Sequence, residues 1–214
     1  MSRTLTLVFF AAAFLFATFA SGQQPAPSAA PQGTPAYADV MQALSGNDLT
    51  DATGATANGL KYLYGVQLIG LYFSAHWCPP CRAFSPKLVD FRNQCRKSKL
   101  PFEVVFVSSD RDAMAMQGYM KDVKMPWPAL PYGSKLEQLV KKRFGVGGIP
   151  TLIILDYKGN LITRNGRNDV QKLGPMAYNQ WMQMALTIQK NQPAPKPAPA
   201  PAQAPAPQPA APQP

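Results

Sequence analysis

The sequence predicts an α/β domain with a central mixed β-sheet flanked by helices. Apolar runs of strand length alternate with segments that carry apolar side chains at helical spacing, and a tight turn joins the last two runs. Alternating strands and helices favour parallel pairing, whereas a tight turn joins antiparallel strands. A third observation locates the chemistry, because two cysteines two residues apart lie between the first long strand and the next helix.

The first 22 residues have the layout of a secretory signal peptide. Arg3 precedes an apolar stretch from Leu5 to Ala20, and the small residues Ser21 and Gly22 follow it. As a helix this stretch would span ~24 Å, short of the ~30 Å hydrocarbon core of a bilayer. We therefore expect residues 1–22 to direct export to the periplasm or the extracellular space. The alternative is an uncleaved membrane anchor with the domain facing outward.

Proline, alanine and glutamine dominate residues 23–36 and 191–214. Such segments cannot bury enough apolar surface to offset the entropy lost on ordering. We expect a Pro/Ala-rich linker at 23–36 and a disordered tail at 191–214. Residues 37–190 are then the folded domain.

The first half of the domain is predicted from turn residues and apolar runs. Small and turn-forming residues predict a short hairpin within 49–63. Residues 67–73 are a buried strand, and residues 82–98 form a helix that Pro86 should kink. The run at 102–107 is a second buried strand, since it is rich in valine and phenylalanine.

The second half continues the alternation. Residues 112–123 are a helix with an aspartate near its start, residues 125–132 are a proline-punctuated loop, and residues 136–144 are a helix. A strand at 151–155 is followed by a turn at 158–160 and a hairpin strand at 161–163. The last helix spans 175–190, where one apolar stripe comprises Tyr178, Trp181, Ala185 and Ile188.

The net charge of +10 points to solvated helix ends rather than to a nucleic-acid partner. The basic clusters at 96–99 and 141–143 lie near the ends of predicted helices, where cations complement the helix dipole. We identify no motif of interleaved aromatic and basic residues typical of nucleic-acid binding, and expected export makes that role improbable. We expect a monomer, which would contact a membrane only through its N-terminal segment, and only if that segment is not cleaved.

The pair Cys78 and Cys81 fits redox chemistry better than the other uses of a CxxC motif. A four-ligand zinc site would need all three cysteines and the single histidine, His76, in a poor tetrahedral arrangement, so we expect no metal. Haem attachment needs histidine after the second cysteine, where this chain has Arg82. A purely structural disulfide remains the alternative, since disulfides persist outside the cytosol. If Cys78 opens the helix, the helix dipole stabilises its thiolate.

The third cysteine, Cys95, lies on a predicted helical stripe with Phe84, Leu88 and Phe91. An apolar stripe faces the core of a domain. We therefore expect Cys95 to be a buried, inert thiol rather than a second redox centre.

The segment Leu71–Arg82 resembles the active-site segment of the tryparedoxin and nucleoredoxin branch of the thioredoxin superfamily. Further matching segments follow in order, at residues 102–110, 125–127, 129–131 and 148–151. The resemblance covers roughly residues 49–170. It implies a thioredoxin fold, with the redox pair at a strand-to-helix turn.

The resemblance also implies roles for the residues around the pair. Cys78 is the expected nucleophile and the more exposed cysteine, and Cys81 resolves the mixed disulfide. A cis Ile149–Pro150 peptide bond would face the pair and offer the Ile149 backbone to an extended substrate. Trp77 would belong to the docking surface.

Five further residues have supporting roles by expectation. Pro79 and Pro80 stiffen the loop and change how many backbone donors reach the thiolate. Trp127 supports the rim of the site. Arg82 and His76 lie close enough in sequence to tune the pKa of the pair, although each can equally be a solvated side chain.

Tyr72 marks a departure from ordinary thioredoxins, which the resemblance implies carry a buried acid at this position. A tyrosine, with a pKa near ~10, is a poor base near neutrality. We expect Tyr72 to be either a hydrogen-bonding partner or a core aromatic residue, which leaves the proton acceptor for Cys81 unidentified.

The expected function is that of an exported thiol–disulfide oxidoreductase, acting mainly as a reductant of protein disulfides and without a cofactor. Its partners would be protein or small dithiol and disulfide substrates, and an upstream electron donor. An oxidant or isomerase of the same fold is one alternative. A non-catalytic binding module with a structural disulfide is another.

Overall fold

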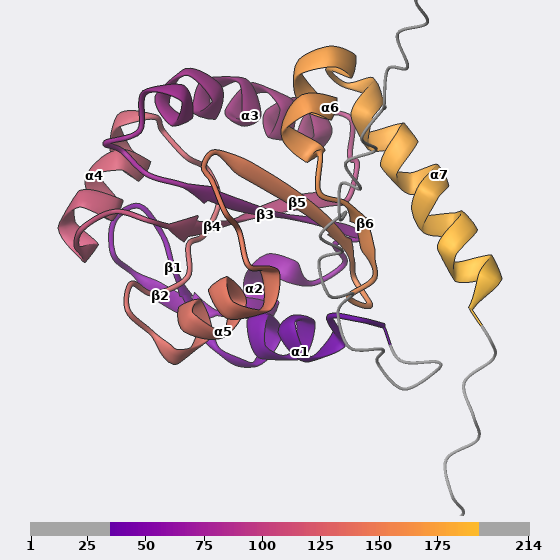
Figure 1. The fold of residues 1–214 in the computed structure, drawn as a ribbon, viewed down its shortest axis with the longest axis horizontal. Coiled ribbons are helices and arrows are strands. Elements are labelled where there is room, and N and C mark those ends of the chain that lie inside the picture. Colours follow the sequence, from indigo (N-terminus) through magenta and orange to yellow (C-terminus); the bar gives the residue numbers. More distant parts are fainter. Residues whose placement is uncertain (1–34, 193–214) are drawn as a thin grey trace, which may run out of the picture.

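The computed structural model describes residues 35–192 and has a four-stranded mixed sheet between two layers of helices (Figure 1). Across the sheet the strands follow the order β4-β3-β5-β6, where the bounds are β3 (Leu68–Ser74), β4 (Phe102–Ser108), β5 (Thr151–Asp156) and β6 (Leu161–Thr163). β3 pairs in parallel with β4, and the other two pairings are antiparallel. The predicted fold class is confirmed. The expected signal segment and most of the expected linker and tail lie outside the described residues.

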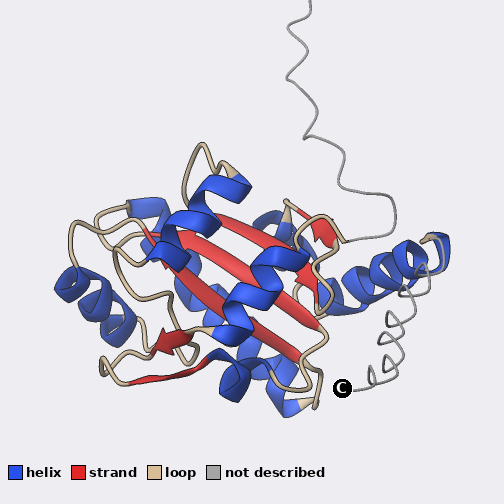
Figure 2. Ribbon diagram, turned by 90° about the horizontal axis from the view of Figure 1, so that it is seen from below, coloured by secondary structure: helices blue, strands red, loops and turns tan. Residues whose placement is uncertain are grey.

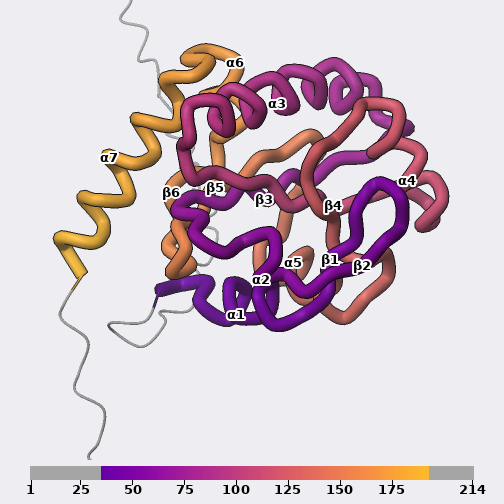
Figure 3. Tube along the Cα trace, turned by 180° about the vertical axis from the view of Figure 1, so that it is seen from behind, coloured from indigo at the N-terminus to yellow at the C-terminus, as the bar shows by residue number. Residues whose placement is uncertain are grey.

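Helices cover both faces of the sheet, as Figure 2 shows from below. One face carries α1 (Ala38–Gly46), α2 (Gly59–Leu63) and α5 (Lys135–Phe144). The other carries α3 (Pro79–Lys97), α4 (Ala113–Asp122), α6 (Gly166–Leu173) and α7 (Met176–Asn191). In Figure 3, α7 lies beside the β6 edge and α4 beyond the β4 edge.

The central strand β3 is buried on both faces, because successive side chains of a strand point to opposite sides. Ile69, Leu71 and Phe73 face the layer of α1 and α5. Leu68 and Tyr72 face the layer of α3 and α7. A continuous apolar run is the expected sequence of a strand covered on both sides.

A hairpin and a short bridging segment extend the sheet beyond β4. The predicted hairpin is formed by β1 (Asp48–Thr50) and β2 (Thr56–Asn58). Ala129 bridges Thr50 of the hairpin and Phe106 of β4. The segment that was expected to be a proline-punctuated loop therefore holds the hairpin against the sheet.

Four helices of the structure differ from the sequence prediction. α1 and α6 were not predicted, and residues 59–63 of the expected hairpin region form the short helix α2. α6 is short, and polar residues dominate its sequence outside the buried Gly166 and Val170. The helix α3 begins at Pro79, before the predicted start, and continues past Pro86 as one element.

The two ends of the described domain lie together at the turn between β5 and β6. The Tyr37 N–H, just before α1, donates to the Gly159 carbonyl at 3.0 Å. Gln192, just after α7, donates through its side chain to Asn160. This turn adjoins Asp156, the partner of Leu68 at the start of β3, so it lies ~20 Å from the other end of that strand.

Among residues 35–192, no helix combines the length and the apolar character needed to cross a bilayer.

Candidate active site

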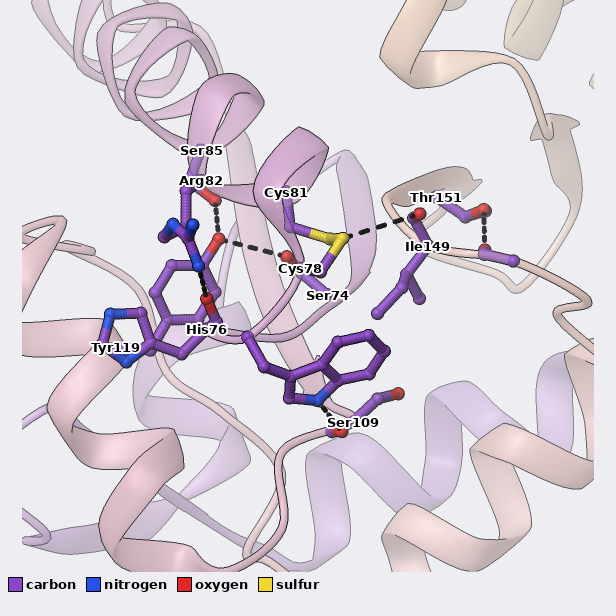
Figure 4. The surroundings of a disulfide bond; sticks show 12 residues. Ser74, His76, Cys78, Cys81, Arg82, Ser85, Ser109, Tyr119, Ile149 and Thr151 are labelled. Carbon is purple, nitrogen blue, oxygen red and sulfur yellow. Dashed lines mark hydrogen bonds between the residues drawn. A yellow bond between two sulfur atoms is a disulfide. The ribbon is translucent and has the colours of Figure 1, made fainter.

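The cysteine pair lies where β3 ends and α3 begins, because three residues after Ser74 turn the chain into the helix. Cys78 is the N-cap of α3, with extended backbone angles of φ −91° and ψ 111°. Cys78 and Cys81 form a disulfide with a Cα–Cα distance of 5.2 Å. The strand–CxxC–helix arrangement is therefore confirmed, and Figure 4 shows the surroundings of the disulfide.

Both cysteines are largely covered. Cys78 is 4% exposed and Cys81 is fully buried, so Cys78 is the more accessible of the two, as expected. Only a small part of Cys78 reaches solvent, so a substrate must come close to the surface around it. Thiol–disulfide exchange passes through a mixed disulfide, so the substrate sulfur must reach the exposed part of Cys78.

Pro79 and Pro80 occupy the first helical positions and are both exposed. Proline is favoured at the first position because its missing N–H would have no intrahelical partner there. The next two donors, the N–H groups of Cys81 and Arg82, both bond the Cys78 carbonyl at 3.1 Å. The backbone would therefore stabilise a Cys78 thiolate through the dipole of the helix and not through a direct hydrogen bond from an N–H group of the first turn.

The peptide bond between Ile149 and Pro150 is cis, as the resemblance implied. Ile149 packs partly buried against Ala75, Cys78 and Cys81. The Cys78 Sγ lies 3.8 Å from the Ile149 carbonyl oxygen, which can accept a hydrogen bond from the reduced thiol. The two segments that the sequence separates by about 70 residues thus meet at the sulfur.

Trp77 is the most exposed aromatic side chain next to the pair, at 55%. Its indole N–H donates to the Ser109 carbonyl at 2.9 Å, which fixes the ring against the loop after β4. Arg82 donates through Nη1 to the His76 carbonyl at 2.7 Å (Figure 4). Both side chains are held at one point while the rest of each faces solvent.

Asp110 joins the loop after β4 to the loop after β3. Its Oδ1 accepts from the His76 N–H at 2.8 Å, and its Oδ2 accepts from the Ser108 hydroxyl at 2.8 Å. The residue is 7% exposed. Asp110 therefore sets the position of the residues immediately before Cys78.

Tyr72 is a hydrogen-bonding partner as well as a core aromatic residue. Its hydroxyl lies 2.7 Å from Ser85 Oγ and accepts from Ser74 Oγ at 2.9 Å. Tyr119 closes a ring of four hydroxyls, at 2.6 Å from Ser85 and 3.2 Å from Ser74. In such a ring each hydroxyl can donate once and accept once, so all four buried groups are satisfied.

Burial raises the pKa of Tyr72 far above its usual value, and the neighbouring Tyr119 adds to the effect. The phenol therefore stays protonated at every pH at which thiols exchange. Ser85, one helical turn after Cys81, brings this ring under the resolving cysteine. The ring offers hydroxyl oxygens there, but no ionised base.

Trp127, which was expected to support the rim of the site, lies in the core behind it. It is 2% exposed and packs edge-on against Tyr72, with ring centroids 6.4 Å apart. The reason lies in the backbone, because the Phe106 N–H bonds the Pro128 carbonyl and holds this segment against the sheet. Trp127 supports the site from the core, through Tyr72.

His76 is partly exposed and stacks on Tyr119, with ring centroids 5.1 Å apart. Its Nε2 lies 3.3 Å from Asp122 Oδ2, an exposed pair. The side chain therefore lies on the α4 side of the site, where it borders the site without contacting the sulfur atoms.

Sequence reasoning missed the buried polar groups Ser74, Ser85, Asp110 and Tyr119. Two of them had a usable signal, since Ser74 shares a strand face with Tyr72 and Ser85 shares a helix face with Cys81. Tyr119 comes from a separate helix, so no local spacing predicts it.

Cys95 is a free cysteine, buried at 2% exposure among the predicted stripe of Phe84, Leu88 and Phe91. Burial raises the pKa of its thiol to about 11, although Arg92 acts in the opposite direction. The expected inert thiol is thus consistent with both its position and its acidity. No cluster of three or more potential metal ligands occurs within residues 35–192.

Comparison with known proteins links this geometry to a family. A family model described as Thioredoxin-like matches residues 65–161. Nucleoredoxin from Danio rerio is 37% identical over 141 residues, which cover 65% of this chain and 32% of that protein. Probable nucleoredoxin 1 from Arabidopsis thaliana is 46% identical over 108 residues, 50% of this chain and 18% of that protein. The chain therefore spans a third or less of the length of these two relatives.

Solved structures match over most of their own length. Thioredoxin from Wuchereria bancrofti has 39% sequence identity and a TM-score of 0.56, with 65% of this chain and 96% of that chain covered. Tryparedoxin II from Crithidia fasciculata has 38% identity and a TM-score of 0.55, with 66% and 91% covered.

Proposed function

The chain belongs to the thioredoxin superfamily, in its nucleoredoxin- and tryparedoxin-like branch, and from this premise we propose that it is an exported reductant of protein disulfides. The general activity in this proposal, that of a thioredoxin-like oxidoreductase, is supported by the family match and by the relatives. The observation that carries the proposal is the position of the Cys78–Cys81 pair, at the N-terminus of α3 and against Ile149–Pro150.

The proposed cycle starts from the dithiol. The Cys78 thiolate attacks one sulfur of a substrate disulfide, the substrate S–S bond breaks, and the departing sulfur leaves as a thiolate that takes a proton. Cys81 then loses its proton and attacks Cys78 Sγ, which releases the second substrate sulfur. Two electrons pass from the pair to the substrate, and the pair ends as the disulfide described here.

The direct test uses the dithiol form on a disulfide-bonded protein such as insulin, with dithiothreitol supplied as the electron donor. We expect turnover above the dithiothreitol background, abolished in Cys78→Ser. Cys81→Ser should stall as a mixed disulfide that mass spectrometry detects at the combined mass. Turnover retained in Cys78→Ser would refute the assigned nucleophile.

The direction of electron flow is decided by the reduction potential of the pair. A difference of ~30 mV corresponds to about tenfold in the equilibrium constant of this two-electron couple. We expect a potential like that of reducing members of the superfamily, about −270 to −200 mV. A value of about −120 mV would instead indicate an oxidant.

Export rests on the apolar stretch from Leu5 to Ala20 and the small residues after it. Expression of the full chain should give a secreted or periplasmic product whose first residue lies shortly after Ala20. N-terminal sequencing checks the cleavage, and cell fractionation checks the compartment. A cytosolic product with an intact N-terminus would contradict the proposal.

A further inference from the structure

A pocket of about 350 Å³ lies between the turn that carries the disulfide and the start of α4. Its lining comprises His76, Trp77, Arg82, Asp110, Arg111 and Ala115. Trp77 directly precedes Cys78 and Arg82 directly follows Cys81, so two of the lining residues belong to the segment that carries the disulfide. The Ile149 carbonyl oxygen lies 3.8 Å from the Cys78 Sγ.

The pocket presents two guanidinium groups. Arg82 is exposed and uses Nη1 for the His76 carbonyl, which leaves its other N–H groups available. Arg111 is exposed, and within residues 35–192 its side chain has no hydrogen-bonding or ionic partner. Its backbone carbonyl accepts from the Tyr132 hydroxyl at 2.6 Å, so the loop that carries it is anchored.

The carboxylates near the pocket are already used. Both oxygens of Asp110 accept hydrogen bonds, and the residue is buried beneath the pocket. Asp122 faces the His76 ring, and Asp112 accepts from the Ala115 N–H at the start of α4. A ligand that enters the pocket therefore meets free cationic donors, whereas the one carboxylate among the lining side chains already accepts hydrogen bonds at both oxygens.

We propose that this pocket recognises a carboxylate carried by the substrate next to its reactive disulfide, with Arg82 and Arg111 as the two donors. Guanidinium groups bind carboxylates through two parallel hydrogen bonds, and the exposed Trp77 ring offers an apolar surface between the carboxylate and the sulfur. The inference deepens the proposed function, on which it rests, by assigning a substrate preference. The carboxylate can belong to an acidic side chain of a protein or to a small peptide thiol.

The test compares four disulfides in single turnovers of pre-reduced protein, which need no electron donor. Two are peptide disulfides of one sequence, with Glu or with Gln on both sides of the cysteine. The other two are oxidised glutathione and its ethyl ester. Second-order rate constants come from acid quenching and mass spectrometry of the released thiol.

We expect the carboxylate form of at least one pair to react about fivefold faster than its neutral form, the size of a well-placed exposed ion pair. Arg111→Glu should abolish or reverse this preference, and Arg111→Lys should retain part of it. The matched control is Lys97→Glu, which makes the same charge change at the other end of α3, ~27 Å along the helix.

The outcomes show which substrate supplies the carboxylate, and they distinguish failure of the proposed pocket from failure of the proposed function. A preference confined to the peptides assigns the carboxylate to protein substrates, and one confined to glutathione assigns it to a small thiol. Equal rates within both pairs, or an equal loss of preference in Lys97→Glu, would overturn the proposed pocket while the reductase function stands. Absence of reaction with all four disulfides would overturn the proposed function, and the pocket with it.

Discussion

Four neutral hydroxyls form a ring beneath Cys81, at the place where the resemblance implies a buried acid in ordinary thioredoxins. Tyr72, Ser74, Ser85 and Tyr119 satisfy one another, and burial raises the pKa of Tyr72 above any pH relevant to exchange. The proton that leaves Cys81 must therefore go to water or to the departing substrate thiolate. The ring orders the site without acting as its base.

Removal of one hydroxyl from this ring should cost stability but leave the acid–base behaviour of the reaction unchanged. Tyr72→Phe deprives Ser85 and Ser74 of a buried partner, so we expect a loss of about 1–3 kcal/mol in the free energy of unfolding. The pH profile of the single-turnover rate should keep its midpoint. Denaturant titration and stopped-flow kinetics measure the two effects.

The matched control for that variant is Tyr64→Phe, because the Tyr64 side chain is 89% exposed. It should alter neither the stability nor the rate. A shift of the pH profile in Tyr72→Phe alone would contradict the assignment of Tyr72 as a neutral group.

The thiol of Cys95 should resist alkylation in the folded protein. With a pKa of about 11, only about 0.1% of the thiol is ionised at pH 8, and the side chain is buried. Iodoacetamide at pH 8 should therefore modify the reduced protein at Cys78 and leave Cys95 untouched until a denaturant is added. Peptide mapping checks the sites, and rapid native modification of Cys95 would contradict its inert role.

At the scale of elements, the sequence predicted what depends on local pattern. The strands, the cysteine turn and the stripe of Tyr178, Trp181 and Ala185 on α7 appear as expected, because each element buries a continuous face. α1 and α6 escaped prediction since they are short and their packing against the sheet, rather than propensity, stabilises them. The burial of Trp127 could not be predicted from local pattern, because its segment is held by the long-range bridges of Ala129.

A buried ion pair joins α3 to the edge strand β4. Arg92 donates through Nε to Glu103 Oε1 at 3.0 Å and through Nη2 to the other oxygen, and the side chains are 7% and 11% exposed. Glu103→Leu should cost about 3–5 kcal/mol, because it leaves the Arg92 charge buried and unpaired. The double variant Arg92→Met, Glu103→Leu should recover most of that loss. Urea denaturation of the three proteins tests this, and additive losses would contradict the pairing.

The turn between β5 and β6 depends on a glycine. Gly159 has φ +92°, and a Cβ there would lie 2.5 Å from the Tyr37 carbonyl group. Gly159→Ala should therefore lower the free energy of unfolding by about 1–2 kcal/mol, because alanine is strained at this positive φ. The clash of its Cβ with the backbone just before α1 should lower it further. Gly145→Ala is the matched control, because Gly145 has φ +52° but open space around it. Equal losses of stability in the two variants, measured by thermal denaturation, would show that the contact with Tyr37 is unimportant.

At the scale of the whole molecule, stability should fall at alkaline pH. Burial raises the pKa of Cys95 from 9.0 to about 11, and it also raises those of Tyr72 and Tyr178 from 10.0. A raised pKa means that the folded state holds the proton more tightly than the unfolded state. This contribution to stability is therefore complete below about pH 9 and is lost as the pH rises through 11.

Guanidinium titrations between pH 7 and 11 measure this dependence. Cys95→Ala removes one of the titrating groups, so the slope of stability against pH between 9 and 10 should become shallower than in the parent protein. The variant will also be less stable at pH 7, because it leaves a small cavity in the core. An unchanged slope would contradict the raised pKa of Cys95.

The meeting of both domain ends at the β5–β6 turn has a practical consequence for labelled and immobilised forms of the protein. A label, a surface tether or a fusion partner attached at either end lies at the pole remote from the disulfide, so it leaves the reactive face open. The same proximity makes the domain suited to circular permutation, with a short linker across the turn and new ends in an exposed loop elsewhere. Orientation on a surface is thus built into the domain, whichever end is used to immobilise it.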